Sequence, residues 1–438
     1  ICEQIKIQIV MNVKYHPIDA SLFIENRKKF TAELKPNSIA IFNSNDEMPR
    51  SGDTNFTFRQ NADLFYLSGI DQEESILVIF PNAPLPQHRD IFYLSGVDQE
   101  ESVLLLYPDA PYEHLKEILF LRETNEHIAI WEGHKYTKEE ARATSGITSV
   151  YWTEEFNSIV PMLMHHAENV YININENDRH STEVPYRDMR FAREWKNRFP
   201  GHRFERLGQI MAKLRSQKHT LEIALIKEAI KHTESAFRRV LKFIKPGVME
   251  YEIEAEIIHE FIRNRCSGHA YNPIIASGYS ACVLHYNENN KPCKDGDLIL
   301  MDFGAEYANY AAVNGKFSPR QKDVYNAVLR VMRAATQMLV AGNTIEKYHA
   351  QVGKLMEEEL LKLKLITPED IKNQNPDWPA YKKYFMHGTS HFLGLDVHDV
   401  GNKYLPMQPG MVFTCEPGIY IPDEGIGIRI ENNILVTT

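Results

Sequence analysis

The chain has few of the features that mark secreted, membrane-spanning or nucleic-acid-binding proteins. Its five cysteines include no Cys-x-x-Cys pair and are too sparse for a disulfide framework, which favours a reducing compartment, the cytoplasm. A net charge of −10 without a polybasic run argues against nucleic acid or an anionic membrane as the main partner. No apolar run is long enough to cross a bilayer. Residues 1–10 lack the plan of a signal peptide, and we expect Met11 to be the true start.

Three histidines stand close together near the carboxyl end, in His387-Gly-Thr-Ser-His391-Phe-Leu-Gly-Leu-Asp-Val-His398. The glycines at 388 and 394 lower helix propensity, so the pattern favours a loop or strand entry over a helix. The zinc-helix motif His-Glu-x-x-His is absent. On its own the segment also suits three surface histidines in a loop.

Apolar segments on either side of these histidines carry carboxylates where a core would normally exclude them. Asp302 ends the run Asp297-Leu-Ile-Leu-Met-Asp302, and Glu416 follows Met411-Val-Phe-Thr-Cys. In Ile426-Gly-Ile-Arg-Ile-Glu431 the isoleucines alternate with Gly427, Arg429 and Glu431, which predicts a strand with one polar face. A carboxylate among aliphatic residues is costly unless it is paired or binds a metal. With His391, these carboxylates form a hard donor set suited to Mn²⁺, Fe²⁺, Co²⁺ or Zn²⁺.

The ordered segments around Asp302, His387 to His398, Glu416 to Tyr420 and Gly427 to Glu431 resemble the metal-site motifs of the Xaa-Pro aminopeptidases, or aminopeptidases P, of peptidase family M24. The resemblance extends over nearly the whole chain from Met11 and includes Phe58-Arg-Gln-Asn-Ala-Asp-Leu-Phe-Tyr-Leu-Ser-Gly. It implies an α+β protein. An amino-terminal α/β domain over 11–205 would precede a pita-bread (creatinase/aminopeptidase) domain over 206–438, with a curved antiparallel sheet covered by helices.

Periodicity in the residues agrees with this plan. Strand-like runs alternate with charged helical stretches up to about residue 204, an α/β pattern. Beyond it, apolar residues at helical spacing predict four helices, over 219–245, 251–265, 321–340 and 346–363.

The resemblance also implies a reaction and the residues that perform it. Peptides with proline second would lose their amino-terminal residue by metal-assisted hydrolysis, in a protein that forms a homodimer or tetramer. The family holds two Mn²⁺ ions. The implied metal ligands are Asp302, His391, Glu416 and Glu431. The implied catalytic groups are Glu416, as general base, and His398 and His285, as hydrogen-bond donors to the peptide carbonyl. His387 and Tyr420 would shape the proline pocket, and Arg429 would orient Glu431. From its local sequence alone, His285 is interpreted as a histidine in a turn and not as a catalytic residue.

One departure from the family pattern is a repeat. Residues 64–84 return, with conservative changes, as residues 91–111, whereas the family has this stretch once. Two copies do not make a solenoid, which needs about three. We expect a duplicated segment whose extra copy lies at the edge of the amino-terminal domain, where a sheet offers unpaired backbone groups.

The second departure is a deletion. After Ala312 the family continues with an aspartate, Thr-Arg-Thr and a proline, but here Ala312 runs directly into Val313-Asn-Gly-Lys-Phe317. The missing aspartate bridges both metals in the family. With three carboxylates instead of four, we expect the site to bind one metal or none.

Three alternatives to an active Xaa-Pro aminopeptidase follow from these observations. A prolidase of the same fold would act on Xaa-Pro dipeptides. A catalytically impaired homologue would keep the pocket only to bind peptides. A damaged reading frame would explain the repeat, the deletion and an end at Thr438, short of where the family's chains stop.

Overall fold

The computed structural model describes residues 15–16, 18–19, 21–51, 54–68, 76–79, 103–106, 117–121, 123, 130, 137–139, 149–174, 176, 184–307 and 319–437. The chain divides into two compact units, Ile1–Leu214 and Arg215–Thr438. The junction between Ala312 and Val313 lies outside the described residues, as do most of residues 64–111 apart from 64–68, 76–79 and 103–106.

The first unit is built on a seven-stranded mixed sheet, in the order β7-β6-β5-β4-β1-β8-β9. Its strands are β1 (Ser38–Asn43), β4 (Ile76–Ile79), β5 (Val103–Leu106), β6 (Glu117–Leu121), β7 (Ser149–Trp152), β8 (Asn169–Ile172) and β9 (Arg203–Arg206), beside a small hairpin of β2 (Pro49–Ser51) and β3 (Thr54–Asn55). Its helices are α1 (Ser21–Ala32), α2 (Ala62–Ser68), α5 (Phe156–Met164), α6 (Arg187–Arg198) and α7 (Gly208–Ser216), the last of which contains the division between the units.

Helices cover both faces of the centre of this sheet. Every residue of β1 is buried. Ile39 and Ile41 pack in one cluster with residues of α5 and α6, while Phe42, on the other face, meets Phe30 of α1 edge to face. A strand covered on both faces needs a continuous apolar run, which is what the sequence supplies.

Both copies of the repeat contribute a strand to the interior of the sheet, so the expectation of an insertion at its edge is wrong. β4 from the first copy pairs antiparallel with β1, and β5 from the second copy pairs antiparallel with β6. β4 and β5 pair parallel to each other, with Ile76 opposite Val103 and Leu77 opposite Leu104, the equivalent residues of the two copies. Each copy offers an equally apolar four-residue run, which suits a central strand as well as the other does.

One buried carboxyl makes the stability of this unit depend on pH. Asp188, in the first turn of α6, accepts a hydrogen bond from Asn43 Nδ2 at 2.7 Å. Burial raises the pKa of Asp188 from 3.8 to about 8. The folded chain therefore holds a proton that the unfolded chain releases above about pH 4, and stability falls as pH rises towards 8.

Asp188→Asn is expected to remove this slope, because the amide stays neutral and still accepts from Asn43. The variant should match the wild type near pH 4 and exceed it at pH 8, gaining at most about 1.4 kcal/mol per pH unit between them. Urea unfolding at both pH values measures the difference. Asp46→Asn, which breaks a surface ion pair with Arg190, is the control and should change stability by less than about 1 kcal/mol. Identical pH dependence in Asp188→Asn and the wild type would contradict the argument.

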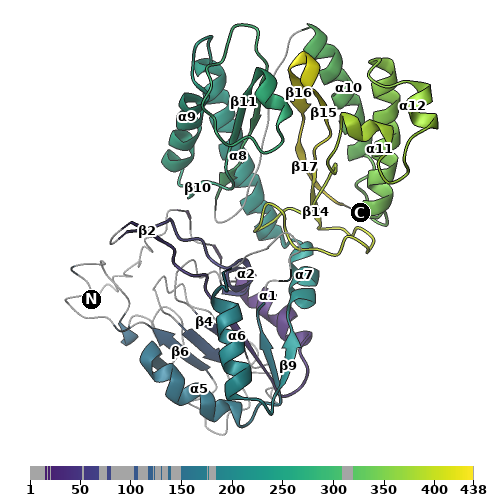
Figure 1. Ribbon diagram of the computed structural model, residues 1–438. Helices are drawn as coiled ribbons and strands as arrows, with labels where there is room; N and C mark the ends of the chain where they lie inside the picture. Colours follow the sequence, from purple (N-terminus) through teal and green to yellow (C-terminus); the bar gives the residue numbers. More distant parts are fainter. Residues whose placement is uncertain are drawn as a thin grey trace, which may run out of the picture. The chain divides into compact units, whose positions relative to one another are not determined.

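The second unit has two helix pairs beside antiparallel strand pairs (Figure 1). Its helices are α8 (Thr220–Phe243), α9 (Glu250–Arg263), α10 (Pro319–Thr336), α11 (Ile345–Lys362) and the short α12 (Pro368–Lys372). Its strands are β10 (Gly268–His269), β11 (Ile274–Ser277), β12 (Ile299–Asp302), β13 (Ala305–Glu306), β14 (Val412–Cys415), β15 (Gly418–Ile421), β16 (Ile426–Arg429) and β17 (Asn432–Leu435). α8 and α9 lie beside β10 and β11, and α10 and α11 lie beside β14 to β17 (Figure 1). All four predicted helices are confirmed.

The strands carry the predicted carboxylates to the ends of apolar runs. β11 pairs with β12 so that Ile274 lies opposite Asp302, and β15 pairs with β16 so that Gly418 lies opposite Arg429. Ile426, Ile428 and Ile430 are buried on one face, as the alternation predicts. The polar ends of β12 and β16 are therefore held in place by apolar packing on the opposite face.

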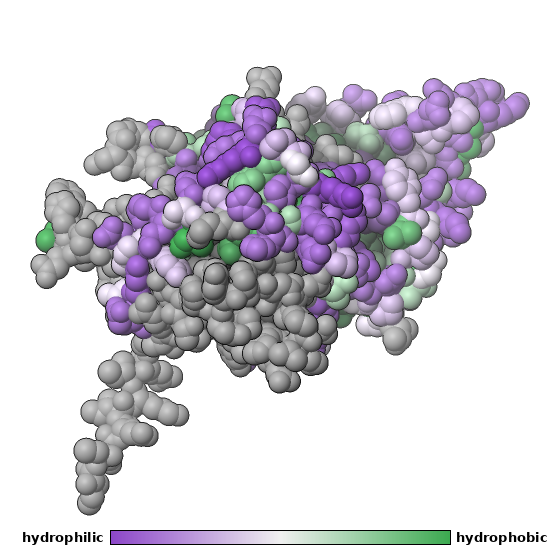
Figure 2. Space-filling model, turned by 90° about the horizontal axis from the view of Figure 1, so that it is seen from below, coloured by the Kyte–Doolittle hydropathy of each residue, from purple (hydrophilic) through white to green (hydrophobic). Residues whose placement is uncertain are grey.

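Most described residues on the face of the molecule in Figure 2 are hydrophilic, and apolar residues there form small separate patches. Within the described ranges, no helix is both long and apolar enough to cross a membrane. The four described cysteines are all free thiols, and three of them are buried.

Candidate active site

Asp302 is held from two sides at the end of β12. Tyr271 Oη donates a hydrogen bond of 2.6 Å to Asp302 Oδ1, and Arg429 Nη2 forms an ion pair with Oδ2. The side chains of Arg429 and Asp302 are 8% and 16% exposed. A buried carboxylate with a cation and a hydroxyl donor is electrostatically satisfied. Asp302 is therefore engaged by protein groups.

A directional chain of hydrogen bonds runs from Arg429 to the histidine loop. Arg429 Nη1 donates to Tyr420 Oη at 2.9 Å, and His387 Nε2 lies 2.9 Å from the same oxygen. His387 Nδ1 lies 2.8 Å from Gly388 O, which can only accept, so Nδ1 carries the hydrogen and Nε2 accepts from the Tyr420 hydroxyl. Burial lowers the pKa of His387 to about 4 and raises that of Tyr420 to about 12. Both groups are consequently neutral at physiological pH.

The unprotonated ring nitrogen of His391 faces Glu416. His391 Nδ1 lies 2.8 Å from Phe392 O and so carries the hydrogen, while Nε2 lies 3.5 Å from Glu416 Oε1. The hydroxyl of Thr414 donates to Glu416 Oε1 at 3.4 Å, and the main-chain nitrogen of His391 donates to Thr414 Oγ1 at 3.1 Å. This tautomer, fixed by a carbonyl on the far nitrogen, is the one that metal-binding histidines adopt.

Glu431 follows β16 and is surrounded by other acidic groups. Burial, followed by the charges of Glu416 and Asp302, raises the pKa of Glu431 well above its ordinary value, and Arg429 only partly opposes this. Arg429, which pairs with Asp302, thus offsets only part of the negative charge around Glu431. A divalent cation beside these carboxylates would lower the pKa of Glu431 further.

The sequence-predicted residues are linked into one region of the second unit. Beyond the pairs above, the ring centroids of His391 and His398 lie 3.9 Å apart, and the charge of His285 contributes to the lowered pKa of His387. However, among the residues that the structure describes, no group of three or more His, Cys, Asp or Glu side chains is arranged as a metal-ion site. His391 Nε2 and Glu416 Oε1 lie 3.5 Å apart, whereas Asp302 is paired with Arg429.

Tyr271 and Thr414 are contacts of the site that sequence reasoning missed. Tyr271 lies in the turn before β11 and reaches Asp302, 31 positions further along the chain. No spacing or composition marks either residue. Only the β11–β12 pairing, once known, places Tyr271 near the end of β12.

Comparison with known proteins shows that the chain is a metallopeptidase. The model for metallopeptidase family M24 matches residues 224–438, and the model for the amino-terminal domain of aminopeptidase P matches residues 23–86 and again 81–171. The chain belongs to this family of metal-dependent hydrolases, in its aminopeptidase P branch. Each of the two amino-terminal matches contains one copy of the repeat.

Named relatives and solved structures support the same family assignment. The chain is 32% identical to the Xaa-Pro aminopeptidase of Haemophilus influenzae over 95% of this chain and 91% of the relative, and 29% identical to human Xaa-Pro aminopeptidase 3 over 94% and 78%. It is also similar to the structure of Escherichia coli aminopeptidase P with the inhibitor Pro-Leu, with a TM-score of 0.78 and 30% identity over 96% and 94% of the two chains. Resemblance and fold class are therefore confirmed.

Proposed function

We propose that this protein releases the amino-terminal residue from peptides whose second residue is proline. The observation that carries the proposal is the half-buried group of Asp302, Glu416 and Glu431, with His391 Nε2 3.5 Å from Glu416 Oε1. It occurs in a chain similar along its length to Xaa-Pro aminopeptidases. A buried group of acids short of positive charge is costly to a fold and is expected where a cation binds.

The residues that would hold a divalent cation are His391, Glu416 and Glu431. Such a cation lowers the pKa of water and polarises a peptide carbonyl. We propose one cation rather than two, because Asp302 is paired with Arg429 and the family's bridging aspartate is absent from the sequence. Manganese is our proposal for the native ion; a zinc-substituted form of the Escherichia coli enzyme is known.

The chain's own side chains would divide the remaining tasks. Glu416, whose carboxylate is oriented by a hydrogen bond from Thr414, would take a proton from the attacking water. His398 and His285 would donate hydrogen bonds to the carbonyl oxygen as its negative charge develops. His387 and Tyr420, neutral and tied to Arg429, would form a rigid wall for the proline ring.

Localisation and assembly complete the proposal. The four cysteines in the described part of the chain are free thiols, which suits a reducing compartment, and we place the protein in the cytoplasm. We also propose a homodimer or tetramer, which light scattering of the purified protein would measure.

The expected substrate pattern is tested with matched peptides. With manganese present, an Xaa-Pro-Yaa tripeptide should be cleaved at least ten times faster than the Xaa-Pro dipeptide, and Xaa-Ala-Yaa should resist. Glu416→Gln should lose about 10²- to 10⁴-fold in turnover, the usual contribution of a general base. Tyr279→Phe, at an exposed position, is the control. Faster cleavage of the dipeptide would identify a prolidase instead, and binding without any cleavage would identify a peptide-binding homologue.

A further inference from the structure

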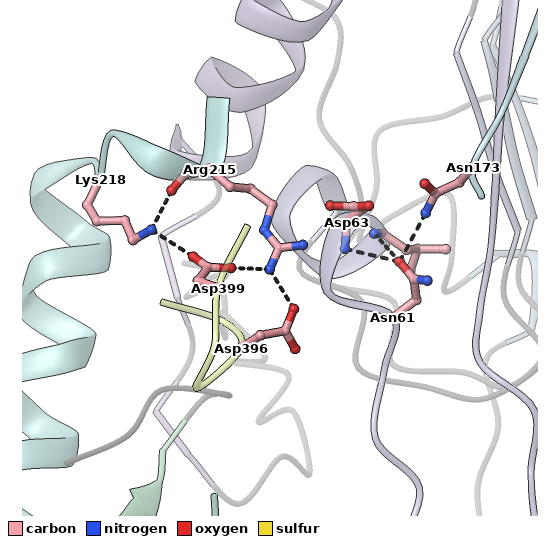
Figure 3. Close-up of polar contacts among 8 residues, drawn as sticks. Asn61, Asp63, Asn173, Arg215, Lys218, Asp396 and Asp399 are labelled. Atoms are coloured by element: carbon pink, nitrogen blue, oxygen red, sulfur yellow. Dashed lines mark hydrogen bonds and ion pairs between the residues drawn. The ribbon is translucent and has the colours of Figure 1, made fainter. Parts of the chain in front are cut away.

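Arg215, Lys218, Asp396 and Asp399 form an ion-pair network (Figure 3). The two aspartates lie close to His398 in the sequence. Lys218 Nζ lies 2.8 Å from Asp399 Oδ2 and also donates to the carbonyl of Arg215. Arg215 Nη2 lies 2.8 Å from Asp396 Oδ2 and 2.5 Å from Asp399 Oδ1. Two cations and two anions thus balance one another.

The network is almost entirely buried. The side chains of Arg215, Lys218 and Asp399 are at most 3% exposed, and only Asp396, at 34%, reaches solvent. Burying charges costs several kcal/mol for each ion, and replacing such pairs with apolar residues often stabilises a protein. A contribution to the stability of the fold therefore does not explain why the chain buries these four charges.

The two aspartates lie on either side of His398 in a closed turn. The main-chain nitrogen of Asp399 donates to Phe392 O at 3.0 Å, and that of Gly394 donates to Asp396 O at 3.1 Å. The cations come from a different part of the unit, the junction of α7 and α8, where the main-chain nitrogen of Lys218 donates to Gly410 O at 2.9 Å. The network thus fixes both sides of His398 to a second segment.

Gly394 is what allows the network to close. A Cβ atom at this position would lie 2.1 Å from Asp399 Oδ2 and 2.7 Å from Lys218 Nζ. Any side chain here would push the lysine and the aspartate apart. Substituting Gly394 therefore disturbs the network without removing a charge.

We propose that Arg215 and Lys218 are positioning residues for His398. Through Asp396 and Asp399 they hold the turn from residue 391 to 399, so that the His398 ring keeps its place 3.9 Å from that of His391. The catalytic part of this inference rests on the proposed function. The positioning itself is a property of the chain and can be measured in the protein without metal or substrate.

The test observes the His398 ring by NMR in full-length, metal-free protein labelled with ¹³C-histidine, the signal being assigned with His398→Gln. Lys218→Met and Gly394→Ala should both shift or broaden the His398 signal, while that of His202, in the first unit, stays unchanged. Arg330→Met is the matched control, because it breaks another ion pair to a buried carboxylate, Glu359, between α10 and α11. It should lower stability and leave His398 unchanged.

An unchanged His398 signal in folded Lys218→Met would overturn the proposal. If Lys218→Met fails to fold, an unchanged His398 signal in folded Gly394→Ala would overturn the proposal instead. In a chain active enough to assay, Gly394→Ala should lower kcat about 100-fold, as expected for a displacement of about 1 Å, with KM within threefold. A shifted His398 with unchanged kcat would separate the positioning, which would stand, from the catalytic role, which would fall.

Discussion

Inserting Asp-x-Thr-Arg-Thr-x-Pro between Ala312 and Val313 is expected to raise turnover of Xaa-Pro peptides at least about 100-fold and to raise the bound metal from about one to about two ions per chain. Two divalent cations roughly 3.5 Å apart repel by on the order of 20 kcal/mol at an effective dielectric near 20. Asp302, Glu416 and Glu431 supply three negative charges against this, and Arg429 already pairs with Asp302. A fourth carboxylate would restore the balance that a second cation needs.

The matched control carries the same insertion with asparagine in place of aspartate. It restores the length of the segment without its charge, so it should bind one metal and remain slow. Metal analysis by mass spectrometry and steady-state kinetics give the two readouts. Two metals in the unaltered chain, with turnover that the insertion does not change, would show that another group already replaces the missing aspartate.

Deleting residues 69–95 is expected to leave the melting temperature unchanged or to raise it, although 27 residues (95 − 69 + 1) are removed. The deletion joins Ser68 to Gly96, the junction that both copies already contain, and keeps α2 intact. β4 runs antiparallel to β1 and β5 runs antiparallel to β6. One strand in place of the two would be antiparallel to both neighbours, so every other strand would keep its direction. Calorimetry of the two chains measures the result.

Proline substitutions in the full-length chain give the matched comparison. Val78→Pro removes a backbone donor from β4 and should be tolerated, because the second copy can replace that strand. Ile41→Pro in β1, opposite Val78, should unfold the first unit, since no second segment resembles β1 and an interior proline costs about 3 kcal/mol or more. A drop of several degrees on deletion, or equal damage from the two prolines, would mean that both copies are integral to the core.

How much the sequence could predict depends on whether the signal is local. The helices and the strand of Ile426, Ile428 and Ile430 follow from periodicity alone, and the carboxylates in apolar runs mark the site. The placement of the repeat could not be predicted, because two nearly equal segments offer the sheet equivalent strands. The partners of Asp399 lie 181 and 184 positions away, so only the folded chain reveals them.

The parallel pairing of equivalent residues in β4 and β5 has a consequence for the gene. A third copy of the same 27 codons could enter between them in the same way, parallel to both and in register, and would widen the sheet by about 4.8 Å. Loss of a copy would reverse the change. Gain or loss of one 27-codon copy therefore keeps the reading frame and reverses the direction of no other strand in the sheet.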